Sequence, residues 1–116
     1  MTSSPIWLER TELLINNENL EKLAQLNVLI VGLGGVGSFA AEFLARAGIG
    51  IMTIVDGDVV DITNTNRQLP ALHSTVGKSK ALLMQERLLD INPALRLRTI
   101  NQFINPEESS HLVNSE

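Results

Sequence analysis

Continuous apolar runs alternate along this chain with stretches of helical periodicity. The runs at 28–31, 51–55 and 95–100 predict three strands, and the first two are apolar enough to be buried on both faces of a parallel sheet. The segment 38–47 carries small residues suited to close packing on a sheet, which predicts a helix there. A second helix is predicted over about 78–91, where Asn92 and Pro93 end it.

Helical periodicity also precedes residue 26 and is broken near Asn16 and Asn17, and a short helix is expected at 106–113. The element order is therefore β-α-β-α-β behind an N-terminal helical segment. Because crossovers between parallel strands are right-handed, the three strands should take the spatial order 3-2-1. This predicts an α/β fold, a three-layer Rossmann-like half of a doubly wound sheet.

The strand at 28–31 would be central in a complete doubly wound sheet, but here it lies at an edge unless a partner covers it. We therefore expect residues 1–116 to be the N-terminal part of a longer protein.

Composition limits the function classes. Net charge is −4 in 116 residues, so there is no global basic signal for nucleic acid. The chain has no cysteine, which fits a reducing compartment, and we expect a cytoplasmic protein. The apolar stretch 28–55 contains six glycines, and its two charges, Glu42 and Arg46, can pair at i, i+4. We therefore predict no membrane insertion.

A glycine-rich loop follows the first strand and precedes the next helix. It contains Gly32, Gly34, Gly35 and Gly37 in a G-x-G-x-x-G pattern. The first glycine permits a tight turn, the middle pair lets phosphate approach the backbone, and the last lets helix and strand pack closely. The helix N-terminus then offers N–H groups to an anion. Glycine-rich turns also serve plain strand–helix packing, so the motif alone is a weak signal.

Asp56 ends the second strand, 19 residues after Gly37. That position is typical of an acid that accepts hydrogen bonds from ribose hydroxyls. The alternative is a strand-end carboxylate that caps a turn. Loop and aspartate together predict a nucleotide site without distinguishing NAD from ATP.

Cationic and amide side chains after the second strand favour ATP. Arg67 can grip phosphate oxygens and Lys80 can place a point charge, while Asn64 and Asn66 are neutral donors. Loops at the carboxyl ends of parallel strands converge on the ligand crevice, so these groups should meet there. The alternatives are a surface arginine paired with Asp58 or Asp61 and lysines on a solvated helix start.

The same residues resemble the ubiquitin-activating-enzyme-like family, the ThiF/MoeB/HesA adenylating proteins. The matching segments are VLIVGLGGVGS at 28–38, Asp-x-Asp at 56–58, TNTNRQ at 63–68, VGKSK at 76–80 and DINP at 90–93. The resemblance covers about residues 10–105, and the order and spacing of these motifs are specific when taken together.

The resemblance implies ATP·Mg²⁺ binding and adenylation of a carboxylate. Asp56 would hold the ribose, and Asn64, Arg67 and Lys80 would contact the phosphates, with Arg67 and Lys80 as the catalytic pair. Asp58, Asn66 and Gln68 lie in the same motifs and are expected at the nucleotide. Arg10 looks like the family's N-terminal arginine that reaches the γ-phosphate, often across a homodimer. No metal ligand is assigned here, because the family's Mg²⁺-binding aspartate would lie beyond residue 116.

Within the family, GLGGVGSFAAEFLARAGIG and TNTNRQLPAL look most like the enzymes that activate the threonylcarbamoyl group on tRNA and cyclise it. Three alternatives stay open: an activator of a ubiquitin-like sulfur-carrier protein, an NAD(P)-binding oxidoreductase half-domain, and a scaffold without turnover. We expect residues 1–116 alone to show no ATP–pyrophosphate exchange.

Overall fold

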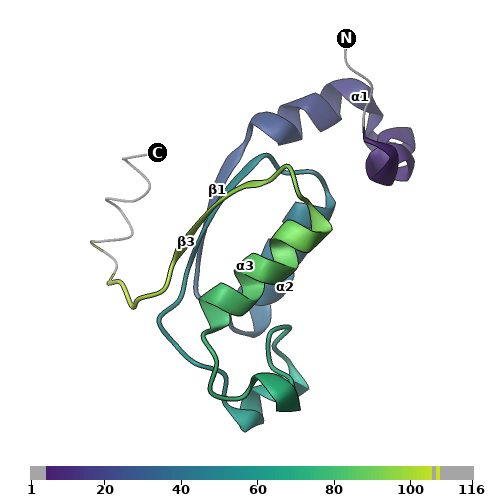
Figure 1. The fold of residues 1–116 in the computed structure, drawn as a ribbon. Coiled ribbons are helices and arrows are strands. Elements are labelled where there is room, and N and C mark those ends of the chain that lie inside the picture. Colours follow the sequence, from purple (N-terminus) through teal and green to yellow (C-terminus); the bar gives the residue numbers. More distant parts are fainter. Residues whose placement is uncertain (1–4, 106, 108–116) are drawn as a thin grey trace.

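The computed structural model describes residues 5–105 and residue 107 (Figure 1). The strands are β1 (Asn27–Val31), β2 (Ile51–Val55) and β3 (Arg96–Ile100), and the longer helices are α1 (Glu9–Gln25), α2 (Gly35–Arg46) and α3 (Lys80–Ile91). Short 3-10 helices span Ile6–Leu8, Ile62–Asn66 and His73–Thr75. The helix expected at 106–113 lies, Glu107 apart, outside the described residues.

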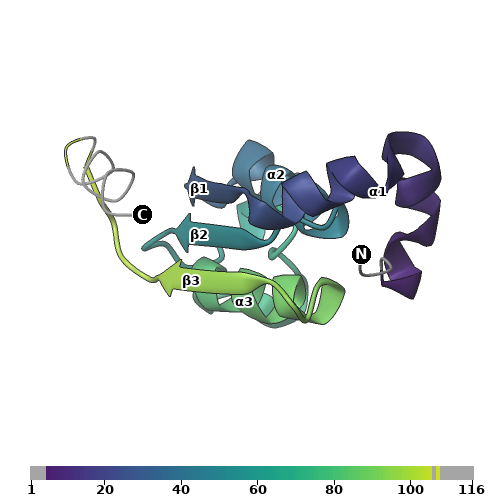
Figure 2. The same cartoon turned by 90° about the horizontal axis from the view of Figure 1, so that it is seen from above.

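The three strands form one parallel sheet in the order β1-β2-β3, so β2 is central. This confirms the predicted α/β Rossmann-like half. Helices α2 and α3 lie together on one face of the sheet, as two right-handed crossovers require (Figures 1 and 2). Of the three predicted layers, the described residues supply the sheet and one helical layer. Helix α1 lies beyond the amino ends of the strands (Figure 2).

The core lies between the sheet and the α2–α3 layer. Alanines at 41, 45 and 81 are fully buried and let both helices approach the strands closely. The larger side chains that fill the remaining space come from β1, β2, α3 and the connections between elements: Ile30, Leu33, Ile49, Met52, Ile54, Met84, Leu88 and Leu95. The small residues that predicted close packing of α2 therefore have that role.

Helix boundaries differ from the sequence prediction at two starts. Helix α2 begins at Gly35, three residues earlier than expected, because the second half of the glycine loop forms its first turn. Glycine has low helix propensity, which hides this start in the sequence. Helix α3 begins at Lys80 instead of 78, since Ser79 caps it by accepting the N–H of Leu82 at 3.2 Å.

Helix α1 is broken at Asn16, as predicted. Asn16 has φ of 67° and ψ of 167°, a strained conformation for any residue other than glycine. Its Oδ1 accepts the N–H of Asn19 at 3.0 Å and so caps the helix that restarts there. The leucine pattern before residue 26 thus belongs to two short helices joined at one residue.

The predicted pair of Glu42 and Arg46 on α2 is present, with Nε to Oε2 at 3.4 Å. Arg87 of α3 also donates to Glu42 and links the two helices, a contact the sequence did not predict. None of the helices in the described part of the chain combines the length and apolar character that a bilayer span requires.

Candidate nucleotide-binding site

The glycine loop leaves the carboxyl end of β1 through a left-handed turn. Gly32 has φ of 90°, which glycine adopts without strain. A Cβ at Gly37 would lie 1.8 Å from the carbonyl oxygen of Gly32, so the first turn of α2 can approach the strand only without a side chain there. No side chain of the described residues caps α2, and Gly34 precedes its first turn. The first and last glycines therefore act as the motif predicted.

Asp56 fastens this loop to the end of β2. Its Oδ2 accepts the N–H of Leu33 at 2.7 Å, and its Oδ1 accepts the N–H of Asp58 at 2.7 Å. The Leu33 side chain is fully buried and anchors the same loop in the core. The turn-capping alternative for Asp56 is thus real, but each oxygen keeps a lone pair for a ribose hydroxyl.

Arg67 and Gln68 fold back over the loop. A Cβ at Gly35 would lie 3.5 Å from Cγ of Arg67, and a Cβ at Gly34 would lie 3.6 Å from Nε2 of Gln68. The Arg67 guanidinium donates to Oδ1 of Asn66 at 3.0 Å and to the carbonyl of Thr63 at 3.4 Å. Among the described residues its pairing with Asp58 or Asp61 is not found. Its exposed cationic end is thus held beside the glycine loop.

Asn64 shapes the segment that carries Arg67. Its Oδ1 accepts the N–H of Asp61 at 2.9 Å, and Asp61 in turn accepts from Thr63, so the two residues cap the 3-10 helix reciprocally. The Thr63 hydroxyl, followed by its backbone N–H, lowers the pKa of Asp61. Asn64 is buried, whereas Asn66 is exposed. Both lie in the predicted segment, but Asn64 has a structural role that the sequence did not indicate.

Lys80 is buried and pairs with Asp58. Its Nζ lies 3.5 Å from Oδ2 of Asp58, and the Lys80 side chain is 6% exposed. The backbone N–H of Lys80 donates to the Asp58 carbonyl at 3.2 Å, so the start of α3 is tied to the end of β2. Lys78, two residues earlier, is exposed. The two lysines near the start of α3 thus differ in their environment, since Lys80 is buried and ion-paired whereas Lys78 is exposed.

A small pocket of about 100 Å³ opens beside Asp56 at the carboxyl ends of β1 and β2, and Gly57 and Phe103 also line it. A Cβ at Gly57 would lie 2.4 Å from the backbone nitrogen of Phe103, so the chain after β3 crosses very close to the Asp-x-Asp turn. This crevice adjoins the predicted ribose acid. Sequence reasoning missed Phe103, because its only signal is a lone aromatic residue after the third strand.

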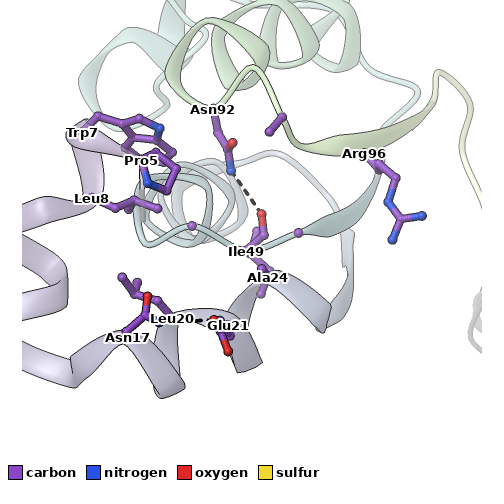
Figure 3. Close-up of a pocket in the computed structure, with 13 residues that line it drawn as sticks. Pro5, Trp7, Leu8, Asn17, Leu20, Glu21, Ala24, Ile49, Asn92 and Arg96 are labelled. Carbon is purple, nitrogen blue, oxygen red and sulfur yellow. Dashed lines mark hydrogen bonds between the residues drawn. The ribbon is translucent and has the colours of Figure 1, made fainter. Parts of the chain in front are cut away.

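A larger pocket of about 320 Å³ lies at the opposite, amino end of the strands, between α1 and the ends of α2 and α3 (Figure 3). Trp7, Leu8, Leu20 and Arg96 line it, with Asn92, whose Nδ2 donates to the carbonyls of Ala45 and Ile49 at 3.3 and 3.1 Å. No residue predicted to bind the nucleotide lines this pocket. The volume of a pocket therefore does not identify the candidate nucleotide site in this protein. We assign the site to the carboxyl edge of the sheet, beside the smaller pocket.

Arg10 is the one predicted site residue that the chain does not bring to this edge. It is the second residue of α1, and Figure 2 shows that this helix lies beyond the amino ends of the strands. Its expected contact with a γ-phosphate therefore remains a prediction. Within the described residues, no three His, Asp or Glu side chains cluster to hold a metal ion. The Mg²⁺ expectation thus stays a prediction.

Sequence reasoning also missed Ser38, which follows the last glycine of the loop. Its hydroxyl donates to the carbonyl of Gly34 at 2.6 Å and accepts the N–H of Leu69 at 3.3 Å. The serine therefore connects the loop with the segment that carries Arg67 and Gln68. The sequence shows that Ser38 ends the VLIVGLGGVGS segment, but it does not show the contact with Leu69, 31 residues further along the chain.

Comparison with known proteins identifies the family. The ThiF family model matches residues 8–115. The chain is 53% identical over 98 residues to the tRNA threonylcarbamoyladenosine dehydratase of Bacillus subtilis, which covers 84% of this chain and 39% of that protein.

Crystal structures of the Escherichia coli tRNA N6-threonylcarbamoyladenosine dehydratase are similar as well. The complex with ATP has a TM-score of 0.89 at 40% identity and covers 100% of this chain and 49% of that one. The complex with AMP has a TM-score of 0.88 at 41% identity and covers 99% and 48%. The chain thus spans less than half the length of these relatives. Together with the glycine loop and the Asp-x-Asp turn at one sheet edge, these matches show that the chain belongs to the ThiF family.

Proposed function

We propose that this chain is the nucleotide-binding N-terminal part of an enzyme that uses ATP to adenylate a carboxylate, namely that of the threonylcarbamoyl group on tRNA. One observation carries the proposal: the glycine loop, Asp56, Arg67 and Lys80 gather at the carboxyl edge of the sheet. Similarity to a dehydratase crystallised with ATP and with AMP supports ATP over NAD.

The residues at this edge fit ATP. Gly34 and Gly35 present backbone without Cβ atoms beside the start of α2, where a phosphate can approach N–H groups. Asp56 would accept from the ribose hydroxyls. Arg67 and Lys80 would contact the phosphates, supported by Asn64, Asn66 and Gln68, while Asp58 holds the Lys80 ammonium.

The proposed reaction needs positive charge on the leaving group. A carboxylate oxygen attacks the α-phosphorus of ATP, the bond to the bridging oxygen breaks, and pyrophosphate leaves with the electron pair. A nucleophilic atom of the same threonylcarbamoyl group then displaces AMP and closes the ring. Arg67 and Lys80 stabilise the charge that develops on the pyrophosphate. Lys80 is suited to this because burial strengthens its electrostatic effect.

Three finer points belong to the same proposal. Mg²⁺ would screen the phosphate charge and would be held by residues beyond this chain. The enzyme would act as a homodimer, so that Arg10 of one copy reaches the nucleotide of the other. A tRNA acceptor would place the reaction in the cytoplasm.

Nucleotide preference and the roles of the two cations are tested together on the full-length protein. We expect calorimetry to detect binding of ATP·Mg²⁺ and not of NAD. Arg67→Ala and Lys80→Ala should each lower kcat/KM for ATP by about 100-fold, the scale of losing one charge-stabilising group. Lys78→Ala is the matched control, because it removes an exposed lysine two residues away and should change kcat/KM by less than about threefold. An unchanged kcat/KM in both test variants would contradict the roles of Arg67 and Lys80, whereas no turnover in the wild-type full-length protein would favour the scaffold alternative.

The acceptor is tested by product analysis. We expect AMP release to depend on tRNA that carries threonylcarbamoyladenosine, with loss of one water from the modified base. AMP release that depends instead on the C-terminus of a ubiquitin-like protein would contradict the tRNA proposal and support the sulfur-carrier alternative.

A further inference from the structure

Ser38 is a fully buried serine in the first turn of α2, directly after the glycine loop. A buried hydroxyl must find hydrogen-bond partners, and this one has two. It donates to the carbonyl oxygen of Gly34 at 2.6 Å and accepts the backbone N–H of Leu69 at 3.3 Å.

The two bonds differ in what they imply. A serine bond to the carbonyl four residues earlier is common in helices and needs no special reason. The bond from Leu69 is different, because it joins segments 31 residues apart. An alanine would fill nearly the same space in the core, so the hydroxyl adds this tie and little else.

Leu69 directly follows the residues that fold over the glycine loop. Cγ of Arg67 lies 3.5 Å from the point where a Cβ at Gly35 would lie, yet Arg67 is exposed. In the part of the chain that the structure describes, the hydrogen bonds of its guanidinium go to Asn66 and to the carbonyl of Thr63, both in its own segment. These bonds orient the guanidinium within the segment but do not hold the segment on the loop.

We propose that Ser38 is a positioning residue for Arg67: it fastens the Arg67-bearing segment to the phosphate loop through Leu69. This rests on the proposed function, in which Arg67 contacts the phosphates of ATP. Without the hydroxyl, the segment samples positions away from the loop, and the population that is competent to bind ATP falls.

The test measures ATP affinity and thermal unfolding of the full-length protein. Ser38→Ala should raise the Kd for ATP about tenfold, as expected if about a tenth of molecules keep Arg67 in place. Ser38→Cys replaces the hydroxyl by a thiol, which is a weaker hydrogen-bond donor and acceptor. The Kd of this variant for ATP should therefore lie between those of wild type and Ser38→Ala.

Thr75→Ala is the matched control. Thr75 is also buried, donates to the carbonyl of Pro70 at 2.6 Å and accepts the N–H of Leu72 at 2.8 Å. Neither bond reaches the glycine loop. Thr75→Ala should therefore lower Tm by an amount similar to Ser38→Ala while leaving the Kd for ATP unchanged.

A double-mutant cycle separates this proposal from the function it rests on. If Ser38 acts through Arg67, Ser38→Ala should change the Kd by less than about twofold in an Arg67→Ala background. A Kd unaltered by Ser38→Ala, or raised by the same factor in both backgrounds, overturns the positioning role while Arg67→Ala alone still weakens binding. If Arg67→Ala alone leaves the Kd unchanged, the proposed role of Arg67 fails and this proposal fails with it.

Discussion

At the residue scale, the glycines of the G-x-G-x-x-G motif differ in whether the surrounding structure leaves room for a side chain. Gly37 is required by the fold, since any Cβ would meet the Gly32 carbonyl oxygen at 1.8 Å. Gly34 has a negative φ of −78°, and a Cβ there would meet only Nε2 of Gln68 at 3.6 Å. Packing therefore explains the absence of a side chain at Gly37 but not at Gly34, where we propose that a phosphate approaches the backbone.

The same substitution at these two glycines should separate folding from binding. We expect Gly37→Ala to lower the free energy of unfolding by about 3 kcal/mol or more, because the overpacked backbone must shift. Gly34→Ala should change it by less than about 1 kcal/mol and still weaken ATP binding by placing a methyl group near the phosphate. Denaturant unfolding and calorimetry with ATP measure the two effects. Unaltered ATP affinity in Gly34→Ala would contradict the assignment of the loop.

Asp56 has a structural role in addition to its proposed contact with the ribose. Its position at the end of β2 predicted a ribose contact, and from that position alone its replacement would disturb only the ligand. The bond to the N–H of Leu33 adds a structural role, because it fixes the loop before any nucleotide arrives. Replacing Asp56 should therefore affect the loop as well as the ribose.

At the element scale, α2 and α3 are joined by a charge cluster beside the core. Glu42 of α2 accepts a hydrogen bond from Arg87 of α3, and its Oε2 lies 3.4 Å from Nε of Arg46. The Glu42 side chain is 9% exposed, while the two arginines remain partly in solvent. The hydrogen bond from Arg87, followed by the charges of both arginines, holds the pKa of Glu42 below its usual value, against the opposing effect of burial.

This lowered pKa predicts a pH dependence of stability. A carboxyl whose pKa is depressed on folding stabilises the protein above its unfolded pKa, near 4.5, and loses that contribution as pH falls through the folded value. Glu42→Gln should cost about 1–3 kcal/mol at pH 7, and the difference from wild type should shrink below pH 4.5.

Thermal unfolding from pH 7 to pH 3 measures this difference. Glu86→Gln is the control, because Glu86 is an exposed glutamate on α3. A gap between Glu42→Gln and wild type that is equally wide at pH 3 and pH 7 would contradict the stabilising role of the ionised carboxylate.

At the scale of the whole molecule, different parts of the chain lie at the two ends of the sheet. The carboxyl edge gathers the proposed nucleotide residues, whereas α1, the helix that contains Arg10, lies beyond the amino ends (Figure 2). This separation agrees with our proposal that Arg10 reaches the nucleotide of a second copy. Residues 1–116 span less than half the length of the similar dehydratases.

Complementation between two inactive full-length variants tests the placement of Arg10. Homodimers of Arg10→Ala and of Arg67→Ala should each lose most activity. Mixed dimers should recover it, because the subunit that keeps Arg67 receives Arg10 from its partner and forms one intact site. Activity is measured after the two variants are unfolded and refolded together. No recovery in verified mixed dimers would contradict a contact across the interface.

The sequence by itself determined the elements and their order. Continuous apolar runs indicate β1 and β2 because buried parallel strands tolerate few polar residues. The G-x-G-x-x-G loop, Asp56, Arg67 and Lys80 indicate the edge of the sheet at which we propose that the nucleotide binds. The break at Asn16 was visible because consecutive asparagines interrupt a leucine pattern.

Only the tertiary structure decided which groups meet, because contacts between distant segments depend on how the elements pack. It placed Ser38 against Leu69, Asp56 against Leu33 and Arg87 against Glu42. It buried Lys80 and left Lys78 exposed, although both lysines look alike in the sequence. It also moved the start of α2 into the glycine loop, since packing at Gly37 stabilises a helical turn that local propensity disfavours.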